Sequence, residues 1–254
     1  MAWAEVFTQD YVIGFILLFF RFGAMFMSAP IFSHQNIPIN IKASLAFTFA
    51  IVFYSSMPTL DIPINIISVI IAILSEIFFG LAIGVILQVA YNVITFAGGQ
   101  ISFMMGFSMA SAIDPQTGVS MPIISQFLSL LALMVLLSLD MHHWLLIFIN
   151  DSLAQVPLGG FLMQENLFKY TIEASSKMFL VGFMIAFPII ALTFLQDVIF
   201  GMLMKTMPQF NLLVIGFPIK IAFAFIVLIA ILTSTMLVFK NHILEAFNYL
   251  EILF

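Results

Sequence analysis

Long hydrophobic stretches that carry no charge make up nearly half of this chain. Asp, Glu, Lys and Arg are all absent from residues 43–60, 77–113, 115–139, 178–196 and 221–239. A helix needs roughly 20 apolar residues to cross the hydrocarbon core of a bilayer. Each stretch is close to that length or exceeds it. The pattern therefore predicts an all-α membrane protein with almost no room for a soluble domain.

Polar breaks and prolines divide the chain into helical segments. Proline inside a helix removes a hydrogen bond, so Pro58 and Pro63 mark a turn, while Pro188 and Pro218 predict kinks or breaks. Residues 140–177 are the most polar stretch and carry no predicted helix. We expect long, kinked and broken hydrophobic helices over about residues 11–33, 39–56, 64–97, 122–139, 178–200 and 212–240.

The third segment is too long for one membrane crossing. A single helix over the charge-free residues 77–113 would measure about 55 Å, because each residue adds ~1.5 Å. The hydrocarbon core is only about 30 Å thick. We therefore predict a break at Gly98-Gly99, since glycine is permissive in its backbone conformation. A segment rich in Gly, Ser and Met follows at residues 98–121.

Composition agrees with a membrane protein and excludes several other classes. Of the 254 residues, 63% are hydrophobic and 7% are charged, whereas about 25% are charged in a typical soluble domain. The net charge of −5 is not that of a nucleic-acid-binding protein. The absence of cysteine excludes disulfides, thiolate catalysis and cysteine-ligated metals. The seven Lys and Arg residues are too few to predict which way the chain is oriented in the membrane.

Four charged residues lie in or beside apolar segments: Arg21, Glu76, Asp197 and Lys220. A charge at mid-bilayer costs roughly 2.5–3.5 kcal/mol on insertion scales, so such residues tend to be paired or to line a wet cavity. One interpretation is an ion-coupled secondary transporter that uses the intramembrane acids Glu76 and Asp197. The other is that these charges pair helices, within the chain or between subunits.

A row of small and polar residues follows one ridge of the third segment. Glu76, Gly80, Gly84, Gln88 and Asn92 are spaced four apart. The two glycines form a small-xxx-small motif, which lets another helix backbone approach closely. Gln88 and Asn92 could form hydrogen bonds across that contact. The pattern predicts helix packing, either inside this chain or against another subunit.

An enzymatic reading finds little support. Gly106-Phe107-Ser108-Met109-Ala110 is similar to a nucleophile elbow, but it lacks the last glycine and the preceding strand. Asp140, His142 and His143 could supply a base only if the fold brought them to Ser108. An intramembrane serine protease remains an alternative. We expect no enzyme, and the absence of a GxxxxGK[ST] loop argues against nucleotide binding.

His142 and His143 are also candidate metal ligands. Adjacent residues on a helix point about 100° apart, so we expect that they do not share an ion. We predict instead a polar helix end at the membrane boundary, with Trp144 as an interfacial anchor. Accordingly, no metal and no cofactor are expected.

Methionine and phenylalanine cluster after the predicted break, at Phe103, Met104, Met105, Phe107 and Met109. Methionine is flexible and adapts to irregular surfaces. A loop at membrane depth must be buried in protein or line a cavity. This segment could therefore form a soft, movable seal, although ordinary core packing is the simpler explanation.

Several blocks of sequence follow one another in an order that is informative as a set: Phe20 to Met25, Ser28 to Phe32, Asp114-Pro115, Met121-Pro122, Leu130 to Leu133, His142 to Leu145, Val156 to Gly160, Met207 to Asn211 and Ile215 to Lys220. Together they resemble the FliR/SctT family of type III secretion export-gate proteins, and its flagellar branch in particular. Two departures are mild: Asp140-Met141-His142-His143 replaces an Asn-Gly-His or Asp-Gly-His pattern, and Lys205 stands where arginine is common.

This resemblance implies a core subunit of the flagellar type III protein export gate, built as a single domain over residues 1–254. With FliP and FliQ it would form a helical hetero-oligomeric channel for unfolded flagellar proteins. FlhB and FlhA would be further partners, with membrane lipid and without nucleic acid. The expected location is the flagellar basal body in the bacterial inner membrane, with much of the complex above the membrane plane.

The resemblance also implies that the loop at about residues 103–118 plugs the pore. Phe103, Met104, Met105, Phe107 and Met109 would be the sealing side chains. Gly106, Ser108, Ala110 and Ser111 would give the loop freedom to move aside.

Overall fold

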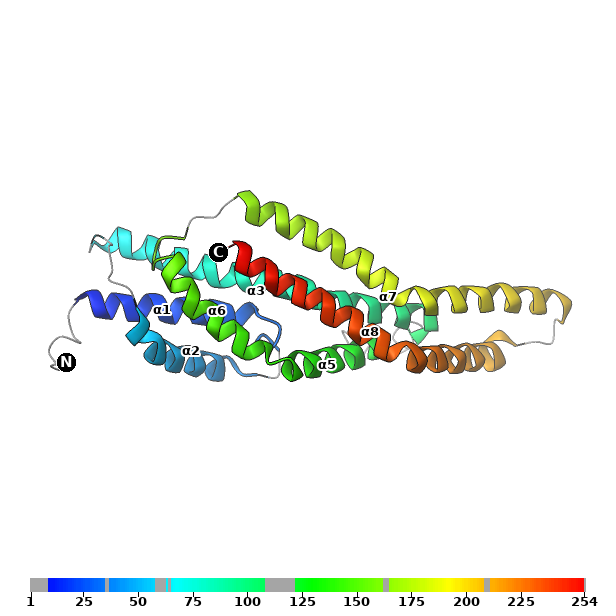
Figure 1. The fold of residues 1–254 in the computed structure, drawn as a ribbon. Coiled ribbons are helices and arrows are strands. Elements are labelled where there is room, and N and C mark those ends of the chain that lie inside the picture. Colours follow the sequence, from blue (N-terminus) through cyan, green and yellow to red (C-terminus); the bar gives the residue numbers. More distant parts are fainter. Residues whose placement is uncertain are drawn as a thin grey trace. The chain divides into compact units, whose positions relative to one another are not determined.

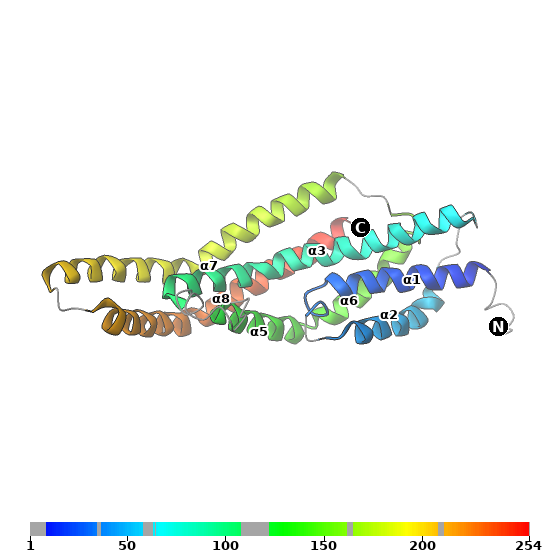
Figure 2. The same ribbon diagram turned by 180° about the vertical axis from the view of Figure 1, so that it is seen from behind.

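The computed structural model describes residues 9–34, 37–57, 63, 65–107, 122–161, 165–207 and 211–253, and these contain helices and no strand (Figures 1 and 2). The prediction of an all-α fold is confirmed. The helices are α1 (Gln9–Ser28), α2 (Ile39–Phe53), the 3-10 turn η2 (Tyr54–Ser56), α3 (Ile66–Met105), α5 (Ile123–Ser138), α6 (Met141–Gln155), α7 (Glu165–Thr206), the π-helical turn η4 (Leu212–Gly216) and α8 (Phe217–Leu253).

Prolines set several of these boundaries. Pro38 directly precedes α2, and Pro122 directly precedes α5. Pro218 lies in the first turn of α8, where a proline costs no intrahelical hydrogen bond. Pro188, by contrast, lies inside α7, and the helix continues past it.

The helices form two compact units, and α3, α7 and α8 each contribute to both. Unit 1 comprises Met1–Ala90, Leu136–Ala174 and Ile243–Phe254, and unit 2 comprises Tyr91–Val135 and Ser175–His242. The division of α3 falls after Ala90, inside a continuous helix. A single functional domain over residues 1–254 stays a prediction.

The core of unit 1 lies where α1 meets α2 and α3. Phe22 of α1 is completely buried, and its ring stacks on Phe53 at 5.4 Å and on Phe49 at 5.9 Å between centroids. Aromatic rings supply large buried apolar areas and favour offset packing at such distances. The α1–α2 pair is therefore held chiefly by aromatic contacts.

In unit 2, short polar contacts join α3 to α5 inside an apolar setting. The Tyr91 hydroxyl donates to the Ser129 carbonyl at 2.7 Å, and the Ser125 hydroxyl donates to the Thr95 carbonyl at 2.7 Å. The Thr95 and Ser129 hydroxyl oxygens lie 3.2 Å apart. Hydroxyls that bond across helices satisfy groups that lipid could not, so these residues fix the position of α5 on α3.

The predicted break at Gly98-Gly99 is wrong, because α3 is one continuous helix of 40 residues that ends only at Met105. A Cβ added at Gly98 would overlap the Ser125 Cα and lie 3.0 Å from the Ser125 nitrogen. Gly98 therefore serves close packing against α5 rather than a break. The length argument failed because it assumed that the whole helix lies in hydrocarbon.

The polar stretch between residues 140 and 177 is largely helical, contrary to expectation. In α6, Met141, Leu145, Ile149 and Leu153 are buried at a spacing of four residues, which is the pattern of an amphipathic helix. Polar residues between these positions, such as His143, Asn150 and Asp151, obscured the pattern. For the same reason α7 begins at Glu165 rather than near residue 178, and α8 extends well beyond residue 240.

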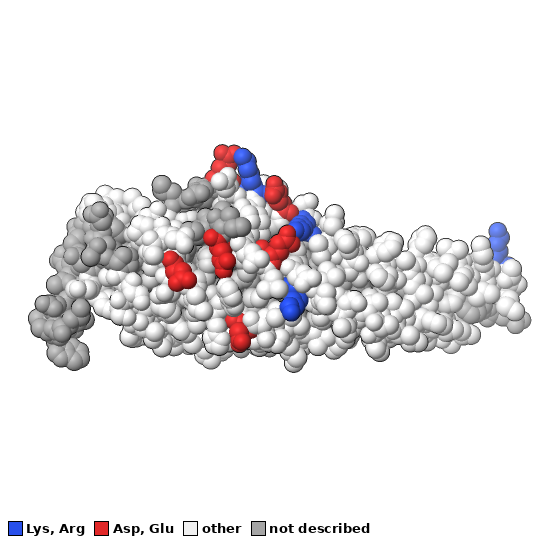
Figure 3. All heavy atoms as spheres, in the orientation of Figure 1, with Lys and Arg blue, Asp and Glu red and all other residues white. Residues whose placement is uncertain are grey.

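Within the described residues, five helices are long and apolar enough to cross a membrane, and α5 with α6 could form a sixth, bent span. On the face drawn in Figure 3, the surface of the second half of α7 and the first half of α8 is almost free of charge, apart from one basic side chain near the end of α7. The predicted membrane class is confirmed by these apolar helices.

The two adjacent glycines of α3 provide a matched test of this packing. Gly98→Ala should destabilise the protein by roughly 1–3 kcal/mol, because its methyl group collides with the α5 backbone. Gly99→Ala should be neutral or stabilising by about 0.5–1 kcal/mol, because no described residue outside its own stretch of helix lies within 4 Å of its added Cβ. Thermal unfolding of the two purified variants in detergent measures the difference. Equal stability would contradict close packing at Gly98.

Candidate functional site

A buried ion pair joins α1 to α3 in unit 1. The side chains of Arg21 and Glu76 are both completely buried. Arg21 Nε donates to Glu76 Oε2, and Arg21 Nη2 donates to Glu76 Oε1 at 3.1 Å, which makes a bidentate pair. This geometry matches the planar guanidinium to the carboxylate. The structure thus brings together two residues that the sequence marked 55 positions apart.

The remaining bonds of this pair reach α6 and the turn that follows it. Arg21 Nη1 donates to Ser152 Oγ at 3.3 Å, and Arg21 Nη2 also donates to the Val156 carbonyl at 3.1 Å. The Gly159 amide donates to Glu76 Oε1 at 2.6 Å. Gly159 has φ +75°, a left-handed conformation in which glycine is not strained. The ion pair therefore anchors the turn at residues 156–161 as well as two helices.

An aromatic layer closes one side of the pair. The Arg21 guanidinium carbon lies 4.4 Å from the centroid of the Phe79 ring, a cation–π contact. The Phe79 ring meets Phe161 edge-on at 5.3 Å, and the Ser75 hydroxyl donates to the Phe161 carbonyl at 2.9 Å. Water is excluded from the charges by these contacts, which strengthens their attraction.

The predicted small-residue ridge packs against α1 of this same chain. A Cβ at Gly80 would lie 2.6 Å from the Arg21 carbonyl oxygen and 2.9 Å from the Met25 nitrogen, and one at Gly84 would overlap Ser28. The glycines are what allow α3 to approach α1 closely enough for Arg21 to reach Glu76. Farther along the ridge, the Ser33 hydroxyl donates to Gln88 Oε1 at 3.4 Å, and Asn92 is half-buried.

A second ion pair lies in unit 2, between α7 and α8. Lys220 Nζ donates to both oxygens of Asp197, at 2.7 Å and 2.8 Å. The Lys220 side chain is 9% exposed, while the Asp197 side chain is 52% exposed. The acid therefore keeps one side open to its surroundings.

These pairings weaken the transporter interpretation. Glu76 is bound to Arg21 and Asp197 to Lys220, so each of the two acids is already neutralised by a cation from the same unit. An ion-coupling carboxylate must be available to exchange its proton or ion during transport. Glu76, which is completely buried in its pair, lacks that freedom in this structure, whereas Asp197 is paired but keeps one side open.

The first residues of the predicted plug form the end of α3. Phe103, Met104 and Met105 lie in the last helical turn; Met105 is fully buried, whereas Phe103 is 62% exposed. Gly106 ends the helix with φ +89°, and an added Cβ there would lie 2.9 Å from the Phe217 ring. The Phe107 ring meets Phe225 at 6.4 Å.

The described part of the predicted plug, residues 103–107, thus lies against the beginning of α8. Ser108, Met109 and Ala110, with the rest of the segment to residue 118, lie outside the described residues. The hypothetical nucleophile Ser108 is therefore not placed relative to the histidines.

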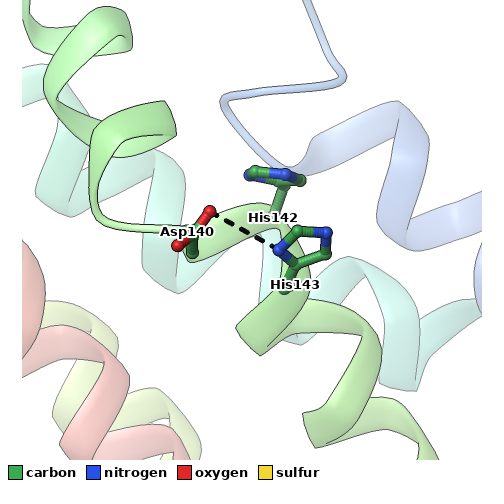
Figure 4. A group of neighbouring side chains, drawn as sticks. All are labelled: Asp140, His142 and His143. Atoms are coloured by element: carbon green, nitrogen blue, oxygen red, sulfur yellow. Dashed lines mark ion pairs between the residues drawn. The ribbon is translucent and has the colours of Figure 1, made fainter.

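Asp140, His142 and His143 converge at the start of α6 (Figure 4). His143 Nδ1 lies 3.5 Å from Asp140 Oδ1, and the two imidazole centroids are only 4.1 Å apart. The expectation that the adjacent histidines diverge is wrong. Cβ directions differ by about 100° on a helix, but the side-chain torsions bring both rings back to one side.

The long apolar helices define an all-α integral membrane protein, in which the charges of Arg21, Glu76, Asp197 and Lys220 are paired inside its own fold. Its family follows from sequence comparison: the chain belongs to the bacterial export proteins, family 1, whose profile matches residues 12–246. The expected resemblance is confirmed. Membership of this family and the apolar helices agree with a location in the bacterial inner membrane.

Among its relatives are proteins named flagellar biosynthetic protein FliR. The relative from Bacillus subtilis (strain 168) is 35% identical over 90% of this chain and 89% of its own length. That from Escherichia coli (strain K12) is 31% identical over 96% and 95%, and that from Aquifex aeolicus (strain VF5) is 23% identical over 97% and 96%. The similarity therefore extends over almost the whole chain.

Sequence analysis missed the partners that Arg21 and Glu76 find after α6. Ser152 contributes a hydroxyl, and Val156 and Gly159 contribute backbone groups. Contacts through backbone groups cannot be predicted from a pattern of side chains. The Pro157-Leu158-Gly159-Gly160 run has the composition of a tight turn, a signal that could have been used to predict one. Its role as a ligand for a buried charge follows only from the fold.

Removing one charge of the buried pair should be far more harmful than removing both. Glu76→Gln leaves Arg21 buried without a counter-charge and should destabilise the protein by about 3–5 kcal/mol. The double variant Arg21→Met with Glu76→Leu should recover a large part of that loss. Denaturant unfolding in mild detergent measures both.

The exposed pair Glu165–Lys169, 2.8 Å apart, is the control for this experiment. Breaking it with Glu165→Gln should cost less than about 1 kcal/mol. If Glu76→Gln proved as mild as this control, the ion pair would not be what holds α1, α3 and the 156–161 turn together.

Proposed function

We propose that this chain is a core subunit of the flagellar type III protein export gate. In this proposal it forms, together with FliP and FliQ, the channel for unfolded flagellar proteins. The observation that carries the proposal is the near full-length similarity to proteins named flagellar biosynthetic protein FliR, within a family of bacterial export proteins. A shorter match could reflect a shared helix pair, but this one includes every helix of the fold.

The lengths of the helices support an assembly. At ~1.5 Å per residue, α3, α7 and α8, with 40, 42 and 37 residues, are about 55–63 Å long along their axes. The hydrocarbon core is about 30 Å thick. Lipid can cover only about half of each helix, yet apolar side chains are exposed along their length. These include Ile66, Phe103, Ile172, Met202, Ile219 and Leu237.

Partner proteins are the natural cover for the apolar surface that lipid does not reach. Large exposed apolar surfaces in water mark protein–protein or membrane contact sites. FliP and FliQ would cover these faces, and FlhB and FlhA would complete the apparatus. In the proposed mechanism the energy for export comes from partners, and the chain itself acts as a passive conduit in the inner membrane at the flagellar basal body.

Residues 103–118 would form the pore plug. Three features of their described part favour this: a left-handed glycine at the helix end, a phenylalanine exposed beside it, and ring contacts with Phe217 and Phe225. Gly106 is a natural hinge, since its backbone reaches conformations closed to other residues. Phenylalanine and methionine side chains could seal against a passing chain and separate again without breaking polar bonds.

Gentle extraction of the tagged chain from its host membrane provides the first test. Native mass spectrometry should show this protein with several copies of two other small hydrophobic proteins, FliP and FliQ. Gly99→Ala, which meets nothing within 4 Å, is the control that should co-purify as the wild type does. A monomer or homodimer in several mild detergents would overturn the proposed assembly.

The plug assignment has its own test. Deleting Gly106–Ala110 should leave the complex assembled but raise its ion conductance in a planar bilayer by tenfold or more. A tenfold rise corresponds to the loss of a barrier to ion passage of about 1.4 kcal/mol. Gly99→Ala should keep the wild-type conductance. An assembled deletion complex with no added conductance would overturn the plug and leave the subunit assignment intact.

A further inference from the structure

The start of α6 in unit 1 carries a group of potential metal ligands that export does not require. One ligand atom from each of Asp140, His142 and His143 can be chosen so that all three lie within 4.8 Å of one another. Figure 4 shows the two imidazole rings facing the same side, with the Asp140 carboxylate next to them. Two imidazoles and one carboxylate are the donor set of many zinc sites.

An unpaired nitrogen at this place also points to a ligand. The Nδ1 atom of His142 is buried and has no hydrogen-bond partner among the residues that the structure describes. Buried polar atoms nearly always have partners, and an exception calls for an explanation such as an ion. By contrast, His143 Nδ1 faces the Asp140 carboxylate. Of the two histidines, the one whose Nδ1 lacks a partner is therefore His142, which is less exposed than Asp140 and His143.

We infer that Asp140, His142 and His143 bind one divalent late first-row transition-metal cation, with zinc as the representative. Imidazole suits zinc, copper and nickel, while the single carboxylate and the absence of further acids within the group make calcium or magnesium a poor fit. Three protein ligands leave one position of a tetrahedral ion for water. The side chains of Asp140 and His143 are 70% and 64% exposed, so a cation can enter from solvent.

The three ligand atoms need to move only a short distance toward one another to bind one ion. Zinc–nitrogen and zinc–oxygen bonds of about 2.0–2.2 Å hold ligand atoms no more than about 4 Å apart. The three ligand atoms must therefore approach by about 1 Å from their present spacing, which small side-chain rotations supply. The positive end of the α6 dipole opposes a cation here, and the adjacent Asp140 carboxylate offsets it.

A bound cation would rigidify the junction between α5 and α6. Asp140 has φ +55°, a left-handed conformation that aspartate tolerates better than most residues. Its carbonyl accepts from the His143 and Trp144 amides at 2.9 Å and 3.2 Å, so it also starts the helix. A metal ligated by both Asp140 and the first turn would hold this backbone in place.

Calorimetric titration of Zn²⁺ into the full-length chain tests the inference. The protein is stripped with a chelator and carries an affinity tag without histidine. Wild type should bind one zinc ion per chain, and His142→Gln, His143→Gln and Asp140→Asn should each weaken binding by about tenfold or more. Asparagine also tolerates a left-handed backbone, so Asp140→Asn removes the charge while preserving the turn.

His242→Gln is the matched control, because it removes an imidazole elsewhere in the chain and should leave affinity unchanged. Loading with Co²⁺ should give the visible absorption of a four-coordinate site, weakened in His142→Gln. Absence of saturable binding by wild type overturns the proposal. So does retention of wild-type affinity in His142→Gln, which would indicate a two-ligand surface contact of Asp140 and His143 only. Neither result touches the export proposal.

Discussion

The structure depends on neutralising charge where water is absent. Arg21 and Glu76 are fully buried, and removing either alone would leave an ion whose desolvation nothing compensates. Their hydrogen bonds link three segments of the chain. Arg21 lies on α1 and Glu76 on α3, and both also bond to α6 or to the turn that follows it. The partners there are Ser152, Val156 and Gly159. One buried charge pair therefore fixes the relative positions of three segments in unit 1.

Close helix packing is the condition for that pair. In hydrocarbon no hydrophobic force drives helices together, so contact depends on van der Waals fit and interhelical hydrogen bonds. Gly80 and Gly84 remove the side chains that would keep α3 away from α1, and Gly98 does the same for α5 in unit 2. Hydroxyl bonds such as that from Tyr91 to the Ser129 carbonyl then fix the register of the α3–α5 contact. Small residues thus decide where the polar contacts can form.

Much of this was predictable from local patterns, and the failures have physical causes. Charge-free runs located the helices, and a four-residue spacing identified the ridge of Gly80 and Gly84. The pairing of Arg21 with Glu76 could be expected only as one option, because sequence does not state which helices meet. The break at Gly98 was predicted from helix length alone, without the neighbour that explains the glycine. The helix α6 was not predicted because polar residues, of which Asp151 is charged, stand between its buried positions.

The wrong prediction that α3 breaks because of its length is also informative. A helix of 40 unbroken residues, most of them apolar, is stable only if something other than bulk water covers any part that extends beyond the bilayer. A break in the helix would remove that need, but α3 does not break. In the proposed assembly, neighbouring protein would cover the parts of α3, α7 and α8 that lipid does not reach. A fold that pairs its buried charges internally and leaves apolar faces open is suited to such an assembly.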